Sequence, residues 1–206
     1  MSEPVDPVLL ARGDSETATD WARHGLAPAY IAGMPRGWVA IAPSGTDAQS
    51  APPYDDAADV LFGRSLPRTL RPALGLRVVG ARLVVSVDLG GRWSRRGWLA
   101  WEPGTGLVRP GGLPVAAIDD LAEVAGVRER HTVDALVDVL HDGAGDAVST
   151  GRRLLAVLDL PAAADFGGSG WVADQPGAQL AQPQEQDVAR FDRSVRSLHE
   201  EDEQSR

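Results

Sequence analysis

Three polar residues of this chain are of the types that build a nucleophilic catalytic triad. Ser15 could attack a carbonyl carbon, His141 could accept the proton of the serine hydroxyl, and Asp138 could orient the imidazole ring. Asp138 and His141 are three residues apart, which places both on one face of a helix. The chemistry requires Ser15 to lie within hydrogen-bond distance of His141 in the folded chain.

The short sequences around these residues resemble blocks of the GDSL-type (SGNH) hydrolase family. The apolar run Val8-Leu9-Leu10 precedes Gly13-Asp14-Ser15, and Asp138-Val139-Leu140-His141 resembles the Asp-x-x-His block of the family. The resemblance implies a parallel α/β fold and a serine hydrolase that uses these Ser, Asp and His residues. The chain departs from the family pattern because it has no Asn to stabilise the oxyanion and no Gly among the four residues after the Ser. We therefore expect no enzymatic activity and keep this hydrolase as an alternative.

A second set of polar residues lies on one face of a helix expected over residues 132–142. His131, Asp134, Asp138 and His141 fall within an arc of roughly 80° at 100° per residue. Imidazole and carboxylate groups bind Zn²⁺, but one straight helix cannot place four side chains around one ion. Only the pairs His131 with Asp134 and Asp138 with His141 could share an ion. The alternative is the solvated face of an amphipathic helix, and we expect no metal and no cofactor.

Residues 64–109 carry an excess of positive charge in an acidic chain. They hold nine Arg against two acidic residues, a local balance of +7 in a chain of net charge −9. Within them, the expected surface for an anion or an acidic partner consists of Arg92, Trp93, Arg95, Arg96 and Trp98. Interleaved Arg and Trp could stack on bases or hold phosphate, whereas alternate Trp on a strand are ordinarily core residues. Because the chain is acidic overall, we expect an acidic protein surface or the protein's own tail here, with nucleic acid as the alternative.

Residues 185–206 predict an amphipathic helix followed by an acidic tail. The apolar residues recur at i, i+3, i+7 and i+10, within an arc of roughly 80°, and are Val188, Phe191, Val195 and Leu198. Such a stripe docks on the parent domain or enters the groove of a protein partner. Residues 162–184, rich in Gly, Gln, Pro and Ala, predict a flexible linker, so truncation after Pro161 is expected to leave the domain folded.

The elements that must position these groups belong to one domain over residues 16–161. Strands are expected at residues 37–42, 76–79, 82–88, 97–101 and 107–109, and Gly80-Ala81 has the composition of a two-residue hairpin turn. Helices are expected at residues 19–24, 55–62, 116–125, 132–142 and 146–159. Strands followed by helices predict an α+β domain, in which an antiparallel β-meander of about four to five strands packs with three or more helices. Residues 1–15 are expected to form a loose N-terminal arm.

Two parts of the chain resemble each other in order. Residues 36–43 resemble residues 96–103, and residues 55–60 resemble residues 119–124. Each pair places a strand before a helix that begins with two acidic residues. The order predicts a duplicated strand–helix unit, to which coincidence in an Ala- and Gly-rich chain is the alternative.

Composition excludes several classes of protein. The chain has no Cys, so it forms no disulfide scaffold and no thiolate metal site. Its N-terminal residues lack the basic and apolar regions of a signal peptide, and no apolar stretch approaches the roughly 20 residues that span a bilayer. We therefore expect a cytoplasmic protein that does not contact a membrane. The features together predict a non-enzymatic interaction or regulatory module with a protein partner, whose identity and oligomeric state the sequence leaves open.

Overall fold

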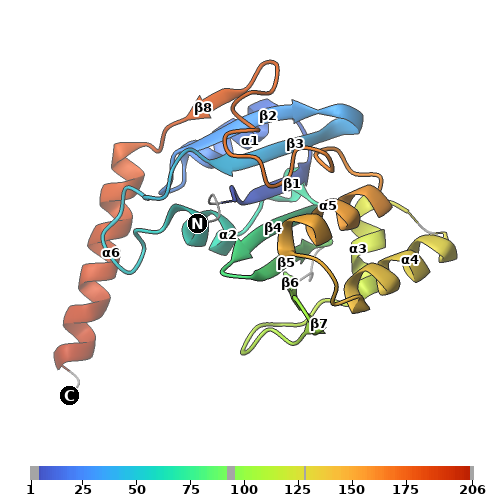
Figure 1. Ribbon diagram of the computed structural model, residues 1–206. Coiled ribbons are helices and arrows are strands. Elements are labelled where there is room, and N and C mark those ends of the chain that lie inside the picture. The colour runs from blue at the N-terminus through green and yellow to red at the C-terminus, as the bar shows by residue number, and fades with distance from the viewer. Residues whose placement is uncertain (1–4, 92–95, 128, 205–206) are drawn as a thin grey trace.

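The chain folds around one antiparallel sheet (Figure 1). The computed structural model describes residues 5–91, 96–127 and 129–204, with only the backbone described from residue 198 onward. Within these residues the sheet has eight strands in the order β7-β6-β5-β4-β1-β3-β2-β8. The strands are β1 (Val8–Arg12), β2 (Ala29–Met34), β3 (Trp38–Pro43), β4 (Ala73–Val79), β5 (Arg82–Asp88), β6 (Gly97–Glu102), β7 (Gly106–Val108) and β8 (Gln179–Ala181). The helices are α1 (Ser15–Arg23), η1 (Pro35–Gly37), α2 (Ala57–Gly63), η2 (Arg68–Leu70), α3 (Ile118–Ala125), α4 (Arg130–His141), α5 (Ala147–Val157) and α6 (Glu185–Gln204).

The predicted α+β class is confirmed, but the sheet has more strands than predicted. The five expected strands correspond to β3 through β7, whereas β1, β2 and β8 were not expected. β1 lies in the segment predicted to be a loose N-terminal arm, and that prediction is wrong because β1 pairs with β3 on one side and β4 on the other. Its residues Val8 to Ala11 are buried. A strand covered on both faces shows a continuous apolar run instead of alternation, which explains the error.

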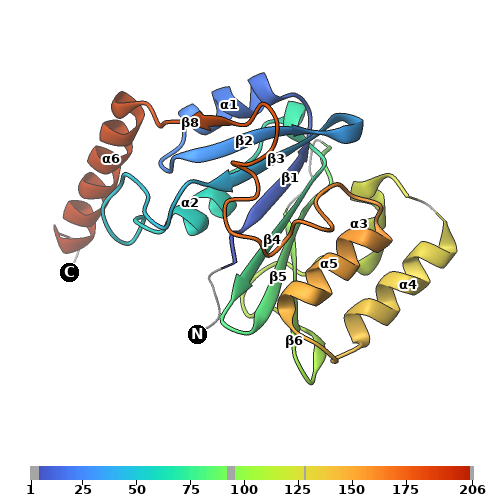
Figure 2. The same cartoon turned by 45° about the horizontal axis from the view of Figure 1, so that its top comes forward.

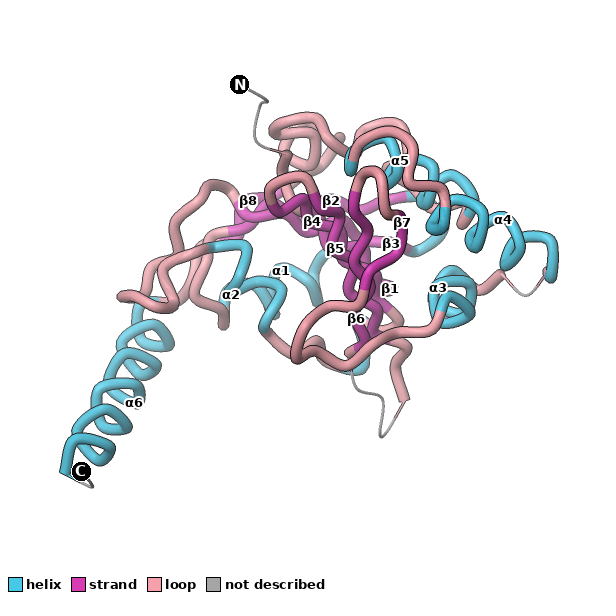
Figure 3. Tube along the Cα trace, turned by 60° about the horizontal axis from the view of Figure 1, so that its bottom comes forward, coloured by secondary structure: helices cyan, strands magenta, loops and turns pink. Residues whose placement is uncertain are grey.

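The sheet carries a hydrophobic core on each face. Side chains of successive strand residues point to opposite faces, so Leu10 of β1 belongs to one core and its neighbour Leu9 to the other. The core that contains Leu10 is covered by α3, α4 and α5, which lie together in Figure 1. The core that contains Leu9 is covered by α1 and α2, on the other side of the sheet in Figure 3. Each of these five helices therefore contributes one apolar face to one of two separate cores.

The predicted hairpin between β4 and β5 is present. Val79 lies opposite Arg82, which leaves Gly80 and Ala81 as the connection. Gly80 has a φ of 60°. This left-handed conformation is disfavoured for residues with a Cβ atom and is typical of the primed turns that match the twist of antiparallel strands.

Residues 162–184 differ from the flexible linker that their composition predicts. Their strand β8 pairs with β2 and extends the sheet at its edge. Phe166 and Trp171 are buried in the core beneath α5. Gly151 of α5 lies directly against the Phe166 ring, since a Cβ atom at position 151 would lie 2.4 Å from the Cε1 atom of Phe166. The segment is therefore a folded cover over the core, tied at its middle by a hydrogen bond of 2.6 Å from the Gly170 N–H to Asp6.

The C-terminal extension predicted by the sequence is present as α6, which runs away from the sheet (Figures 1 and 2). The helix has 20 residues and begins after β8, at Glu185. Despite this length α6 is strongly polar, and no helix in the described part of the chain is both long and apolar enough to cross a membrane.

The two segments that resemble each other occupy comparable places in the sheet. β3 and β6 run in the same direction, each separated from β4 by one strand. The helices of the two segments, α2 and α3, pack on opposite faces of the sheet. The duplication stays a prediction.

Candidate functional site

The structure does not bring the residues of the candidate triad together. Ser15 is the first residue of α1, whose buried residues, such as Trp21, belong to the core beneath α1 and α2. Asp138 and His141 lie on α4, whose buried residues belong to the core on the opposite face. The sheet is also antiparallel, whereas the hydrolase family has a parallel one. The geometry contradicts a triad formed by these three residues.

The Gly13-Asp14-Ser15 block forms the beginning of α1. Asp14 is the N-cap, and it accepts hydrogen bonds from the backbone N–H of Thr17 at 2.7 Å and from the Thr17 hydroxyl at 2.9 Å. The backbone bond first, and then the hydroxyl bond, lower the pKa of Asp14 from its ordinary value of 3.8. Asp146 caps α5 in the same way, and the Ser149 N–H lowers its pKa. The capping role of Asp14 is thus sufficient to explain why Gly13-Asp14-Ser15 stands at the beginning of α1.

The polar face of α4 is open to solvent. His131, Asp134, Asp138 and His141 are all exposed, and Nδ1 of His141 lies 2.9 Å from the carbonyl oxygen of Val137, one turn earlier. Among residues 5–91, 96–127 and 129–197, no group of three or more His, Asp or Glu side chains is close enough to hold a metal ion. Neither of the two pairs on α4 therefore has a third ligand in that part of the chain.

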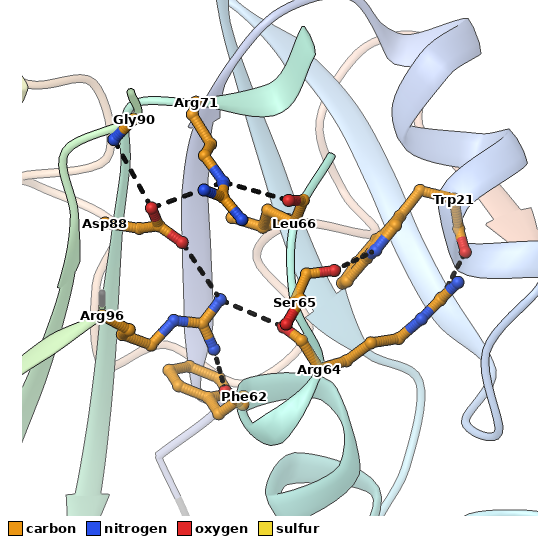
Figure 4. A network of polar contacts seen from close by, with 9 residues as sticks. All are labelled: Trp21, Phe62, Arg64, Ser65, Leu66, Arg71, Asp88, Gly90 and Arg96. Atoms are coloured by element: carbon orange, nitrogen blue, oxygen red, sulfur yellow. Dashed lines mark hydrogen bonds and ion pairs between the residues drawn. The ribbon is translucent and has the colours of Figure 1, made fainter. Parts of the chain in front are cut away.

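The structure describes part of the predicted Arg/Trp surface. Three residues of this surface lie outside the described part of the chain, namely Arg92, Trp93 and Arg95. The side chain of Arg96 is only 13% exposed and lies 3.7 Å from Asp88. Its guanidinium donates hydrogen bonds to the backbone carbonyl oxygens of Phe62 and Arg64 (Figure 4). Trp98 is half-buried against the core beneath α1 and α2. Arg96 is therefore engaged in the interior instead of being offered to a partner.

Asp88 is the centre of a buried ionic network (Figure 4). Its side chain is 6% exposed and lies between the guanidinium groups of Arg71, at 3.4 Å, and Arg96. Arg71 also donates to the backbone carbonyl oxygen of Leu66 at 3.0 Å. Burial lowers the pKa of Arg96, and the nearby Asp88 carboxylate partly offsets this effect. One carboxylate thus holds two buried cations, and the network connects β5 to the segment between α2 and β4.

Other Arg residues of the stretch 64–109 also have partners inside the domain. Arg77 forms an ion pair with Asp59 of α2, and Arg82 forms one with Glu102 on the neighbouring strand β6. In the described part of the stretch, the exposed cations without an ion pair are Arg68 and Arg109. Four of the seven described Arg residues of the stretch are thus paired with acidic side chains inside the fold.

The first half of α6 docks on the domain. Val188 is buried, and the Phe191 ring meets the Tyr54 ring edge to face, with ring centroids 5.0 Å apart. The hydroxyl of Ser50 donates a hydrogen bond of 2.6 Å to Asp192. Two of the four residues of the predicted apolar stripe are therefore used in contact with the protein's own domain.

The second half of α6 extends beyond that contact (Figures 1 and 3). Ser194 is the last residue of the helix to line the cavity between α6 and the domain. Val195 is half-buried, and the side chain of Leu198 lies outside the described residues. The helical backbone continues to Gln204, nearly three turns past Ser194.

A cavity of about 810 Å³ lies where α6 meets the domain. α6 forms one wall, and the end of α1, the loop that contains Tyr54, and α2 form the others. The apolar side chains of its lining are Leu26, Pro53, Tyr54, Val60 and Phe191. The charged and titratable ones are His24, Asp59, Arg64, Asp187 and Arg190. The volume falls in the range of roughly 300–1,000 Å³ that is typical of small-molecule sites.

Sequence reasoning missed this cavity. Its residues come from three separate segments, 24–26, 53–64 and 187–194, and no spacing along the chain connects them. The one local signal is the pair Asp187 and Arg190, charges that flank the apolar stripe of α6. Comparisons with family models, with curated proteins and with solved structures found no match for this chain. Function therefore has to follow from the chemistry of the residues themselves.

Proposed function

We propose that this protein is a non-enzymatic interaction module that offers the second half of α6 to a protein partner. The observation that carries the proposal is that only the first half of α6, up to about Ser194, lines the contact with the domain. Val188 and Phe191 dock on the domain and Val195 is half-buried, whereas the end of the helix runs away from the domain (Figure 1). The docked half holds the start of the helix and fixes its direction, and the second half continues the stripe through Leu198.

Two physical arguments support a protein groove as the binding surface. An isolated helix of about ten residues is marginal in water, so the second half gains stability when its stripe is covered. Val195 and Leu198 are spaced i and i+3, which is the spacing with which amphipathic helices place anchors in a groove. Acidic side chains of the domain already pair with four of its cations, Arg71, Arg77, Arg82 and Arg96. The acidic residues 200–203 are therefore not needed to neutralise these cations.

Acidic substitutions on the second half of the stripe are expected to weaken partner binding strongly. In the double variant Val195→Asp/Leu198→Asp, two apolar anchors become charged, and each anchor is worth about 1.5–3 kcal/mol when buried. We expect affinity to fall at least about tenfold, since 1.4 kcal/mol corresponds to a factor of ten. Crosslinking of the tagged full chain in extracts of its own cells identifies the partner, which is then purified and titrated against both forms by calorimetry.

The matched control is Ala189→Asp/Ser197→Asp. Both positions are exposed and lie on the other side of α6, and the double change adds the same charge. The control is expected to bind like the wild type. If the control weakens binding as much as the stripe variant does, the effect is one of general charge, and the proposal fails. A second copy of the chain as the recovered partner would make α6 a self-association element instead of an adaptor.

A further inference from the structure

The cavity beneath α6 combines an apolar wall with two polar groups that lack full partners. Its apolar side includes the rings of Tyr54 and Phe191, which meet edge to face, and the side chains of Leu26 and Val60. Edge-to-face rings leave aromatic faces against which a third ring or a branched side chain can pack. The wall therefore fits a ligand with an apolar body of the size of an aromatic ring.

The first incompletely paired group is the guanidinium of Arg64. It lies over the Trp21 ring, 4.7 Å from the ring centroid, and donates one hydrogen bond to the Trp21 carbonyl oxygen (Figure 4). No carboxylate of residues 5–91, 96–127 and 129–197 lies within 4.0 Å of it. Burial lowers the pKa of Arg64, and the more distant charge of Asp187 opposes this shift. A guanidinium has five N–H donors in a fork that matches a carboxylate, so Arg64 retains donors for an anion.

The second group is the carboxylate of Asp187. One of its oxygens lies 3.6 Å from Arg190, and its other oxygen, Oδ2, is buried without a hydrogen-bond partner among the described residues. A carboxylate with one buried oxygen that lacks a donor is costly, and the side chain is still 17% exposed, so a cationic donor from a ligand would be favoured beside it. The other acid of the lining, Asp59, is already paired with Arg77. The cavity thus presents one anion acceptor site at Arg64 and one site for a hydrogen-bond donor at Asp187.

We propose that this cavity binds a small zwitterion with an apolar body, of the type of an aromatic or branched α-amino acid. Its carboxylate pairs with Arg64, its ammonium group pairs with the accessible side of the Asp187 carboxylate, and its side chain packs against Tyr54 and Phe191. Because Asp187 and Phe191 belong to α6 and Arg64 belongs to the end of α2, the ligand joins the helix to the domain. The site is independent of any partner at the second half of α6.

The test is a titration of the full chain with a matched set of ligands, followed by calorimetry or by ligand-observed NMR. The zwitterions are L-phenylalanine, L-leucine and L-tryptophan. 3-Phenylpropionate has the body and carboxylate of phenylalanine without the ammonium group, and phenethylamine has the body and ammonium group without the carboxylate. We expect L-phenylalanine to bind at least about tenfold more tightly than either, because each analogue leaves one charged group of the site unpaired.

Two variants assign the contacts. Arg64→Met should remove the advantage of L-phenylalanine over phenethylamine, and Asp187→Asn should reduce its advantage over 3-phenylpropionate. Arg68→Met, which changes an exposed Arg near Arg64 but outside the lining, is the control and should bind as the wild type does. The ligand series on the unaltered chain tests the proposal even if Arg64→Met folds poorly.

Three outcomes would overturn the proposal. The first is the absence of binding by all three zwitterions at up to about 10 mM. The second is equal binding of 3-phenylpropionate and L-phenylalanine, which would mean that Asp187 does not select an ammonium group. The third is full binding by a folded Arg64→Met protein, which would place the ligand elsewhere.

Discussion

Removal of residues 162–206 is expected to unfold the protein or to leave it without cooperative unfolding at room temperature. The truncation deletes strand β8 and the buried side chains of Phe166, Trp171 and Val172. Burying each such side chain contributes about 1.5–3 kcal/mol, so the loss is on the order of 5 kcal/mol or more. Small domains are stable by only about 5–15 kcal/mol in total. This reverses the expectation from the sequence, in which residues 162–184 are only a linker.

Thermal and urea unfolding of two truncated chains measures the effect. The chain that ends at Pro161 should show no sharp transition, whereas the chain that ends at Ser194 should melt within a few degrees of the full chain. The second truncation removes only the part of α6 beyond the cavity. A chain of residues 1–161 with nearly full stability would show that the segment 162–184 does not hold the core together.

Asp88→Ala is expected to give the largest loss of stability of any single charge-removing change. The carboxylate lies between the two mostly buried guanidinium groups of Arg71 and Arg96 (Figure 4). Removing it leaves two cations close together in the interior with no anion beside them. Breaking a buried ion pair by removing one partner costs about 3–5 kcal/mol, much more than the loss of a surface pair. Urea unfolding at neutral pH measures this difference directly.

The matched control is Asp174→Ala, an exposed acid whose removal should change stability by less than about 0.5 kcal/mol. A triple variant, Arg71→Met/Asp88→Leu/Arg96→Met, separates the role of charge from that of shape. It should recover part of the stability lost in Asp88→Ala, because apolar residues of similar volume can replace a buried ionic group. If Asp88→Ala is no less stable than Asp174→Ala, the network contributes nothing, and the assignment of Arg96 to the interior is wrong.

The fold could be predicted where local pattern and tertiary environment agree. β5 alternates because Leu83, Val85 and Val87 face one core, whereas the opposite face carries polar residues, and Gly80 marks the turn before the strand. β1 could not be recognised in the same way, since it is buried on both sides and shows only a short apolar run. β8 has three residues in a Gly- and Gln-rich context, and only its pairing with β2 makes it a strand. The aromatic residues Phe166 and Trp171 are the signs in the sequence that this segment covers a core.

The candidate sites depended on contacts between distant parts of the chain. The sequence neighbours of Arg96 predict that it faces a partner, but its ion-pair partner Asp88 lies on β5, and its carbonyl acceptors lie at the end of α2. Ser15 and His141 have side chains suited to a catalytic triad, but their helices pack on opposite faces of the sheet. The apolar stripe of α6 was correctly placed on a helix, but where docking ends, at Ser194, depends on the domain surface. In each case the role of the residue depends on contacts with distant parts of the chain, which spacing along the sequence does not encode.

Hydrogen exchange along α6 in the isolated full chain tests most directly whether the helix is divided into a docked half and a free half. We expect amides of residues 189–194 to exchange at least about tenfold more slowly than those of residues 198–204, because only the first half is held by the domain. Phe191→Ala should remove much of the protection of the first half without changing the second. Equal, strong protection of both halves at low protein concentration would mean that all of α6 is docked on its own domain, which contradicts the proposed recognition element.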